Sequence, residues 1–191
     1  MGFFDRFKKQ PPAGRETQPS IPAPPSPPSG QPLIDIAAII SHGDPWVMEW
    51  IRVCADDIYS YVESNFHLYA LRGLELEDDL DVLKWIGLVE ILIEAQYVCE
   101  RDWKDELPDF LHFIQNLKGT KRLKLPLDKR WLDPSKDVSD WIQRINSQWS
   151  AKSCCLSVID IDSDSYVLFP CTLQERAQLQ DLARQLERQI Q

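Results

Sequence analysis

The chain has 191 residues, of which 43% are hydrophobic, and a formal net charge of −9 from 21 basic and 30 acidic side chains. That length suits one compact domain with a tail, and seven tryptophans supply a large apolar core. The acidic balance argues against a nucleic-acid-binding protein, because phosphate contact rewards clustered Lys and Arg, and it suits either a basic protein partner or solubility alone.

The five cysteines do not predict a disulfide framework, because their number is odd, Cys154 and Cys155 are adjacent, and no Cys-x-x-Cys occurs. We therefore expect reduced thiols in a cytoplasmic protein.

No run approaches the roughly 20 apolar residues that span a bilayer, so the protein is expected to be soluble. Phosphate-binding loops, dinucleotide fingerprints and Ser-His-Asp arrangements are missing, so no cofactor or metal is predicted.

The first 32 residues differ from the rest of the chain. Met1–Lys9 places three Phe at helical spacing beside basic residues, which predicts at most a weak contact with a membrane surface or a partner. Gln10–Pro32 holds nine of the 14 prolines and is typical of a disordered, extended linker. We therefore divide the chain into this tail, residues 1–32, and a single domain, residues 33–191. Removing the four basic and two acidic residues of the tail leaves 17 basic and 28 acidic residues, so the domain carries −11.

Helical periodicity dominates the first part of the domain. Leu33–Ile40 is a dense apolar run, and Asp44 and Pro45 are start signals for an amphipathic helix over Pro45–Phe66. An acidic cluster at residues 75–81 precedes apolar positions from 83 to 93 and complements the dipole of that helix. Further helices are predicted from Pro108 to Leu117, stopped by Lys118-Gly119, and after Asp137 as N-cap. Short strands are possible at residues 97–99 and 123–127.

The segment Cys154–Cys171 reads CCLSVIDIDSDSYVLFPC and predicts a β-hairpin, because two apolar runs flank a turn of Asp and Ser. By strand alternation, Ile159 and Ile161 face a core, while Asp160 and Asp162 face the other way, with Asp164 at the turn. The three carboxylates are expected to share one accessible surface beside Tyr166. A capping box at residues 172–175 then starts a final helix that runs to Ile190.

This order of elements predicts an α+β fold: a mainly helical single domain with a small antiparallel sheet that includes the late hairpin.

The spacing Asp160-x-Asp162-x-Asp164 matches the front half of a calcium loop. The full loop requires Gly at its sixth position and Glu at its twelfth, and these positions hold Ser165 and Cys171. An EF-hand is therefore excluded. A looser oxygen-ligand site for Mg²⁺ or Ca²⁺ stays open, as does a polar turn whose side chains bond their own backbone.

A second constellation is Asp102-Trp103-Lys104, in the acidic and basic run from Glu100 to Asp105. It can present an indole between opposite charges, which is common chemistry at the centre of protein interfaces. The alternative is a domain corner in which Trp103 packs inward and Asp102 or Asp105 caps the next helix.

Two parts of the sequence resemble a known family. They are Trp85–Leu117, which contains Trp-x-Gly-Leu-Val-Glu, Tyr97 and the Asp-Trp-Lys corner, and the hairpin Ile159–Phe169 with the helix after it. The family is a bacterial one, found in short cytosolic proteins and known only as a domain of unknown function. The resemblance covers roughly Leu74–Leu186. It implies no established activity, cofactor or catalytic residue.

The leading hypothesis is a non-enzymatic, acidic, cytoplasmic protein-binding module. Its partner would be a basic protein, held by the acidic face of the hairpin with Tyr166 as an anchor. An immunity-type protein that neutralises a toxin enzyme is one version of it, by analogy of size and charge. The alternative is a metal-dependent hydrolase that uses the Asp160, Asp162 and Asp164 cluster. The predicted binding residues are Asp160, Asp162, Asp164, Tyr166, Asp102, Trp103 and Lys104.

Overall fold

The computed structural model describes residues 30–191. The predicted fold class is confirmed, because the chain is mainly helical and carries one small antiparallel sheet that includes the late hairpin. The predicted amphipathic start and most of the Pro-rich linker lie in residues 1–29, outside the described part of the chain. None of the helices between residues 30 and 191 has the length and apolar character needed to cross a membrane.

The sheet has three strands in the order β1-β3-β2, and β3 runs antiparallel to both neighbours. The strands are β1 Cys99–Asp102, β2 Cys154–Ile159 and β3 Ser165–Thr172. The helices of the described residues are α1 Gln31–Ser41, α2 Pro45–Asp56, α3 Ile58–Ser64, α4 Phe66–Leu71, α5 Leu80–Glu94, α6 Leu107–Asn116, α7 Lys118–Arg122, α8 Val138–Trp149 and α9 Leu173–Gln185. Single 3₁₀ turns, Lys129–Trp131 and Ser150–Lys152, flank α8.

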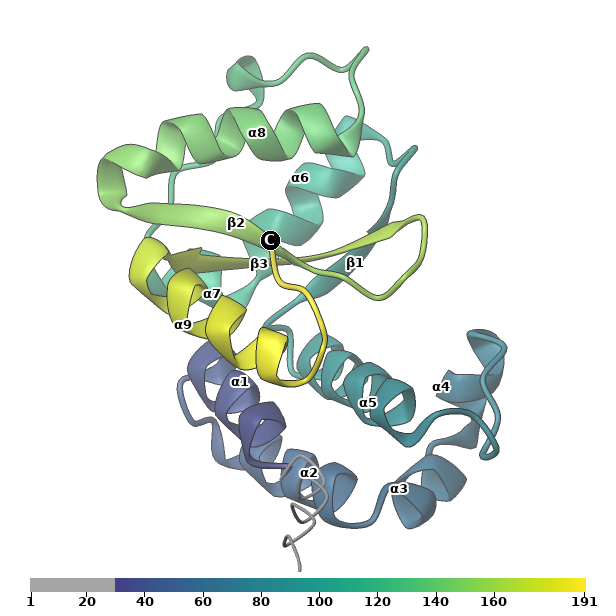
Figure 1. Ribbon diagram of the computed structural model, residues 1–191. Helices are drawn as coiled ribbons and strands as arrows, with labels where there is room; N and C mark the ends of the chain where they lie inside the picture. Colours follow the sequence, from purple (N-terminus) through teal and green to yellow (C-terminus); the bar gives the residue numbers. More distant parts are fainter. Residues whose placement is uncertain (1–29) are drawn as a thin grey trace, which may run out of the picture.

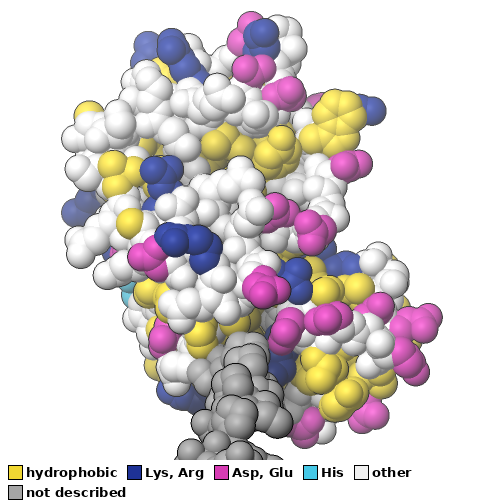
Figure 2. Space-filling view, in the orientation of Figure 1, with side chains coloured by type: hydrophobic (Ala, Val, Ile, Leu, Met, Phe, Trp, Pro, Cys, Tyr) yellow, Lys and Arg dark blue, Asp and Glu magenta, His cyan; other side chains and the backbone are white. Residues whose placement is uncertain are grey.

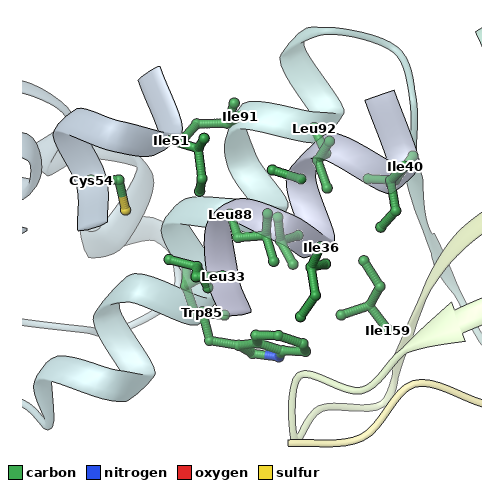
Figure 3. Close-up of a cluster of buried hydrophobic side chains, with 14 of the residues drawn as sticks. Leu33, Ile36, Ile40, Ile51, Cys54, Trp85, Leu88, Ile91, Leu92 and Ile159 are labelled. Atoms are coloured by element: carbon green, nitrogen blue, oxygen red, sulfur yellow. The ribbon is translucent and has the colours of Figure 1, made fainter. Parts of the chain in front are cut away.

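The sheet lies between two helical layers and separates two hydrophobic clusters (Figure 1). On β3, Val167 and Phe169 belong to the cluster formed with α1, α2, α5 and α9, whereas Leu168 belongs to the cluster formed with α6 and α8. This is the period of two that a strand requires when both of its faces are buried. Figure 3 shows Ile159 of β2 in the same cluster as Ile36 of α1.

Three predicted helix starts are confirmed in detail. Asp44 accepts a hydrogen bond from the N–H of Trp46, and Asp137 accepts one from the N–H of Asp140. At the start of α9, Thr172 and Glu175 form the reciprocal capping box, each side chain accepting from the backbone N–H of the other residue. These bonds satisfy N–H groups that have no partner within the helix.

The prediction of one continuous helix over Pro45–Phe66 is wrong. Its chain is divided into α2, α3 and the start of α4. The break falls at Asp57, whose carboxylate accepts hydrogen bonds from the N–H and the hydroxyl of Ser60 at 3.2 and 2.7 Å. A short polar side chain that bonds nearby backbone competes with the helix ladder, so it starts a new helix instead of continuing the old one.

The region after α6 also differs from the prediction. Gly119 does not stop a helix but lies inside α7, packed so closely on Pro170 that a Cβ there would lie 2.8 Å from the Pro170 Cγ. Residues 123–127 form no strand, because the N–H groups of Leu123 and Leu125 bond back to α7 and close its end. The short strand predicted at residues 97–99 is present but is shifted to Cys99–Asp102.

The final helix ends at Gln185, earlier than predicted, and the chain reverses through Glu187, whose φ is 55°. Residues 188–191 then run along the outer edge of β2, where Gln191 exchanges two backbone hydrogen bonds with Val158 at 2.8 and 2.9 Å. The next residue whose backbone groups point outward from that edge is Leu156. Its C=O accepts a hydrogen bond from the side-chain amide of Asn146 in α8, and its N–H donates one to the oxygen of the same amide. The edge of β2 is therefore covered, which protects it from pairing with another chain.

Candidate functional site

The structure brings the two predicted constellations together. In the register of the sheet, Asp102 lies opposite Ser165 and Arg101 lies opposite Tyr166, so the end of β1 meets the start of β3 beside the hairpin turn. Trp103, Asp160, Asp164 and Tyr166 line one pocket of about 570 Å³, which we call the Trp103 hollow. Figure 2 shows hydrophobic side chains bordered by acidic ones at this end of the sheet.

The Trp103 corner is held from within. The Asp102 carboxylate accepts a hydrogen bond from the N–H of Lys104 at 2.8 Å, which fixes the turn after β1. Trp103 is 44% exposed, so the alternative in which it packs inward is wrong. The prediction that Asp102 or Asp105 caps the next helix is also wrong, because the N-cap of α6 is Glu106. The Lys104 ammonium lies 4.4 Å from the centre of the Trp103 ring, close enough for a cation–π contact.

A charged pair supports this corner from behind. The Arg101 guanidinium donates two hydrogen bonds to the Asp105 carboxylate, at 2.5 and 2.6 Å, and lies 3.9 Å from the centre of the Phe113 ring. The bond to Asp105 raises the pKa of Arg101 and outweighs the opposing effect of burial. A bidentate pair of this kind restrains both side chains, so Asp105 is occupied in holding β1 and is not available to a ligand.

The hairpin turn is fixed by Asp160. Its carboxylate accepts a hydrogen bond from the N–H of Asp162 at 2.9 Å, and its backbone oxygen accepts one from the indole of Trp85 at 2.7 Å. Asp162 adopts the left-handed conformation with φ 54°, which Asp and Asn tolerate better than most residues. Because Trp85 is buried in α5, the turn is tied to the core of the domain.

The three carboxylates do not line one pocket. Asp160 and Asp164 line the Trp103 hollow, whereas Asp162 lines a different pocket together with Arg188. The prediction failed for Asp162 because β2 ends at Ile159, so the alternation of a strand does not continue through the turn. The apolar half of the prediction holds, since Ile159 is buried and Ile161 packs against the main core.

The carboxylates of the Trp103 hollow lack basic neighbours. Within residues 30–191, neither Asp160 nor Asp164 lies within 4.0 Å of a Lys, Arg or His nitrogen. Two unpaired carboxylates beside an indole and a phenol form a site that attracts a cation. No group of three or more His, Cys, Asp and Glu side chains in the described part of the chain converges as a metal site would require.

Sequence reasoning missed an interior ion network. Arg72 bonds both Glu90 of α5 and Glu100 of β1, each at 2.6 Å, and all three side chains are largely buried. Burial lowers the pKa of Arg72, but the hydrogen bonds that it donates to Glu100 and Glu90 outweigh burial and raise that pKa overall. These charges line a pocket of about 580 Å³ between α5, β1 and α6. They satisfy one another, and no sequence spacing signals their meeting.

Sequence reasoning also missed Arg188, because the reversal of the chain after α9 carries no strong turn signal. The five cysteines are free, as expected, and all of them are buried. Cys155 and Cys171 lie opposite each other on β2 and β3, with their sulfurs 3.7 Å apart and the Ser157 hydroxyl within reach of both. Hydrogen bonding to Cys155 and burial raise the pKa of Cys171, so its thiol stays neutral.

Comparison with known proteins identifies a family. Searches of curated proteins and of solved structures returned no match. A family model described as Domain of unknown function (DUF6630) matches residues 32–191. The match begins at the start of α1 and therefore includes helices α1 to α4, which precede the region of resemblance noted from the sequence motifs. The chain belongs to this family, the domain of unknown function DUF6630.

Proposed function

We propose that this protein is a non-enzymatic binding module for a basic protein, and that the Trp103 hollow receives a Lys or Arg side chain of that partner. The observation that carries the proposal is the placement of two unpaired carboxylates, Asp160 and Asp164, in one pocket with the exposed ring of Trp103. A cation in this pocket would gain charge-assisted hydrogen bonds and contact with an aromatic face.

Two further observations support the proposal. The Trp103 ring already contacts an ammonium group, that of Lys104, so this indole makes a cation–π contact within the domain itself. The charge of the domain would also accelerate the approach of a basic partner, since complementary charge raises association rates. An immunity-type protein that neutralises a toxin enzyme is one form of this function, supported by analogy of size and charge. A cytoplasmic location belongs to the same proposal and is supported by five free, buried cysteines.

The test is a titration of the protein with the basic peptide acetyl-Gly-Lys-Arg-Lys-Gly-amide, followed by nuclear magnetic resonance of the tryptophan indole N–H groups. We expect a saturating shift of the Trp103 signal, which the Trp103→Phe variant identifies. The double variant Asp160→Asn, Asp164→Asn should lower the affinity by about tenfold, the loss of roughly one charge-assisted contact.

A matched control separates local contact from net charge. The variant Glu49→Gln, Asp181→Asn also removes two negative charges, but at exposed positions of α2 and α9. It should bind the peptide nearly as the wild type does. Equal losses in the two double variants would show that only overall charge matters, and the Trp103 hollow would then have no part in binding.

A further inference from the structure

A second pocket lies beside the hairpin turn, where residues 161–163 approach α5. Its volume is about 430 Å³, and its charged lining residues are Arg72, Glu100, Asp162 and Arg188. We call it the Arg188 pocket. Figure 2 shows basic, acidic and hydrophobic side chains meeting where the hairpin turn approaches α5.

Arg188 enters this pocket with its hydrogen-bonding capacity unused. The side chain is 19% exposed, and its Nε is buried without a hydrogen-bond partner among the described residues. The nearest acidic atom is Asp162 Oδ2, which lies 3.9 Å from Nη1, too far for a hydrogen bond. A guanidinium has five N–H donors, and folded proteins supply partners to nearly all buried donors. A guanidinium that lines a pocket and leaves its donors unpartnered therefore points to a ligand.

The other charges of the pocket do not supply this partner. Glu100 is held by Arg72 at 2.6 Å. Asp162 is 89% exposed, so water screens its attraction to Arg188. Arg72 has two carboxylate partners and needs no third. Arg188 is thus the charged group of this pocket whose donors remain available.

Apart from Ser163 and Ser165, the rest of the pocket lining is apolar, and it decides what kind of anion fits. Leu71, Leu74, Val82 and Ile86 line it, and Leu71 is 84% exposed, so its side chain is free to be covered by a ligand. A phosphate would leave this wall bare, and Glu100 and Asp162 would repel its higher charge. A carboxylate with a hydrocarbon chain would use both parts of the pocket.

We propose that the Arg188 pocket binds a small apolar carboxylic acid. The carboxylate accepts hydrogen bonds from the Arg188 guanidinium, and the hydrocarbon chain covers Leu71 and its apolar neighbours. The planar guanidinium suits this role, because it can present two parallel N–H groups to one carboxylate. The proposal does not depend on the Trp103 hollow, although Ser163 and Ser165 of the turn line both pockets.

The test uses hexanoate, with hexanamide as a neutral control and inorganic phosphate as a second anion. The N–H signal of Arg188 Nε, identified by its loss in Arg188→Gln, reports on the site directly. We expect hexanoate to shift this signal in a saturable way, and hexanamide and phosphate to leave it nearly unchanged. No shift with hexanoate, or an equal shift with phosphate or hexanamide, would overturn the proposal.

Two variants sharpen the result. Arg188→Gln should weaken hexanoate binding at least tenfold, whereas Arg184→Gln, a control near the same end of α9 with an exposed side chain, should not change it. Asp162→Asn should tighten binding about threefold, because it removes a competing carboxylate, and Asn tolerates the φ of 54° at this position. Unchanged or weaker binding in Asp162→Asn contradicts the proposed site even if Arg188→Gln does not fold.

Discussion

Asp102 of β1 lies directly opposite Ser165 of β3, and this pairing carries Trp103 to the hairpin turn. The antiparallel register of β1 and β3 thus determines which charged groups surround the indole. A strand of four residues is short, and the bidentate Arg101–Asp105 pair restrains the turn that follows it. The proposed binding site depends on this junction between two segments that are far apart in the sequence.

Lys104 gives the first prediction. Its ammonium lies over the Trp103 ring and would repel an incoming Lys or Arg side chain, because like charges at an interface oppose binding. Lys104→Met should therefore tighten binding of the basic peptide by about two- to fivefold, equivalent to a surface charge contribution of up to about 1 kcal/mol. Calorimetric titration measures this change. Weaker binding in Lys104→Met would mean that Lys104 itself contacts the peptide.

Arg72 gives the second prediction. Arg72→Met leaves Glu90 and Glu100 close together and largely buried without a counter-ion. We expect a loss of about 2–4 kcal/mol in the free energy of unfolding, since removal of one partner exposes the cost of burying the others. Urea unfolding followed by circular dichroism measures it. Arg184→Met, which breaks an exposed pair with Asp181, is the control and should lose less than about 1 kcal/mol.

Gly87 gives the third prediction. In the middle of an exposed helix, replacing Gly by Ala stabilises a protein by up to about 1 kcal/mol. Gly87 is buried in α5, and a Cβ there would lie 2.5 Å from the Cys54 sulfur and 2.8 Å from the Tyr69 hydroxyl. Gly87→Ala should therefore lower the unfolding free energy, by about 1–3 kcal/mol, as overpacked cores do. A rise in the thermal midpoint would contradict this packing.

Asn146 gives the fourth prediction. Asn146→Ala removes both hydrogen bonds to the backbone of Leu156 and opens the edge of β2. The unfolding free energy should fall by about 1–3 kcal/mol, because two part-buried backbone groups lose their partners. We also expect faster aggregation on heating, measured by light scattering. Asn146→Asp is a useful contrast, because its carboxylate can still accept the Leu156 N–H but can no longer donate to the carbonyl.

The buried thiols give a pH prediction. Burial raises the pKa of Cys54 and of Cys99 from the ordinary thiol value of 9.0 to about 12. Since the unfolded chain loses these protons first, the stability that the neutral thiols provide is complete below pH 9.0 and is lost between pH 9.0 and about 12. In that range, each thiol lowers the free energy of unfolding by up to about 1.4 kcal/mol for each unit of rise in pH.

Thermal unfolding between pH 7 and pH 11 measures this slope. The variant Cys54→Ala, Cys99→Ala should be less stable at neutral pH but should lose stability less steeply above pH 9. Buried Tyr61 and Tyr69, whose pKa values are also raised by burial, keep part of the slope in the variant. An unchanged slope would show that the two thiols ionise equally in the folded and unfolded states.

Local signals predicted the parts of the fold that depend on neighbouring residues. The hairpin, the cap at Asp44 and the capping box at Thr172 follow from turn and cap chemistry within a few residues. The break at Asp57 is also a local feature, but a single Asp is its only signal in the sequence. The strong helical period of apolar residues around Asp57 led instead to the prediction of one continuous helix.

The candidate site was predictable only in pieces. Its side chains were identified as two separate groups, but their meeting is set by the pairing of β1 with β3, which no short-range pattern encodes. The different position of Asp162 follows from where β2 ends, and the availability of Arg188 follows from the reversal after α9. Both are tertiary properties, because a strand end or a chain reversal is fixed by what packs around it.

The hydrogen bond from the Asp162 N–H to the Asp160 carboxylate spans the wall between two pockets. Asp160 faces one pocket and Asp162 the other, so a ligand that moves either residue disturbs the turn that orients its neighbour. Thermodynamic reciprocity then requires that each occupant alter the affinity of the other by an identical factor. The five-residue loop between β2 and β3 would thereby couple the two proposed sites, so that an organic acid in one would alter the affinity of the other for a cation.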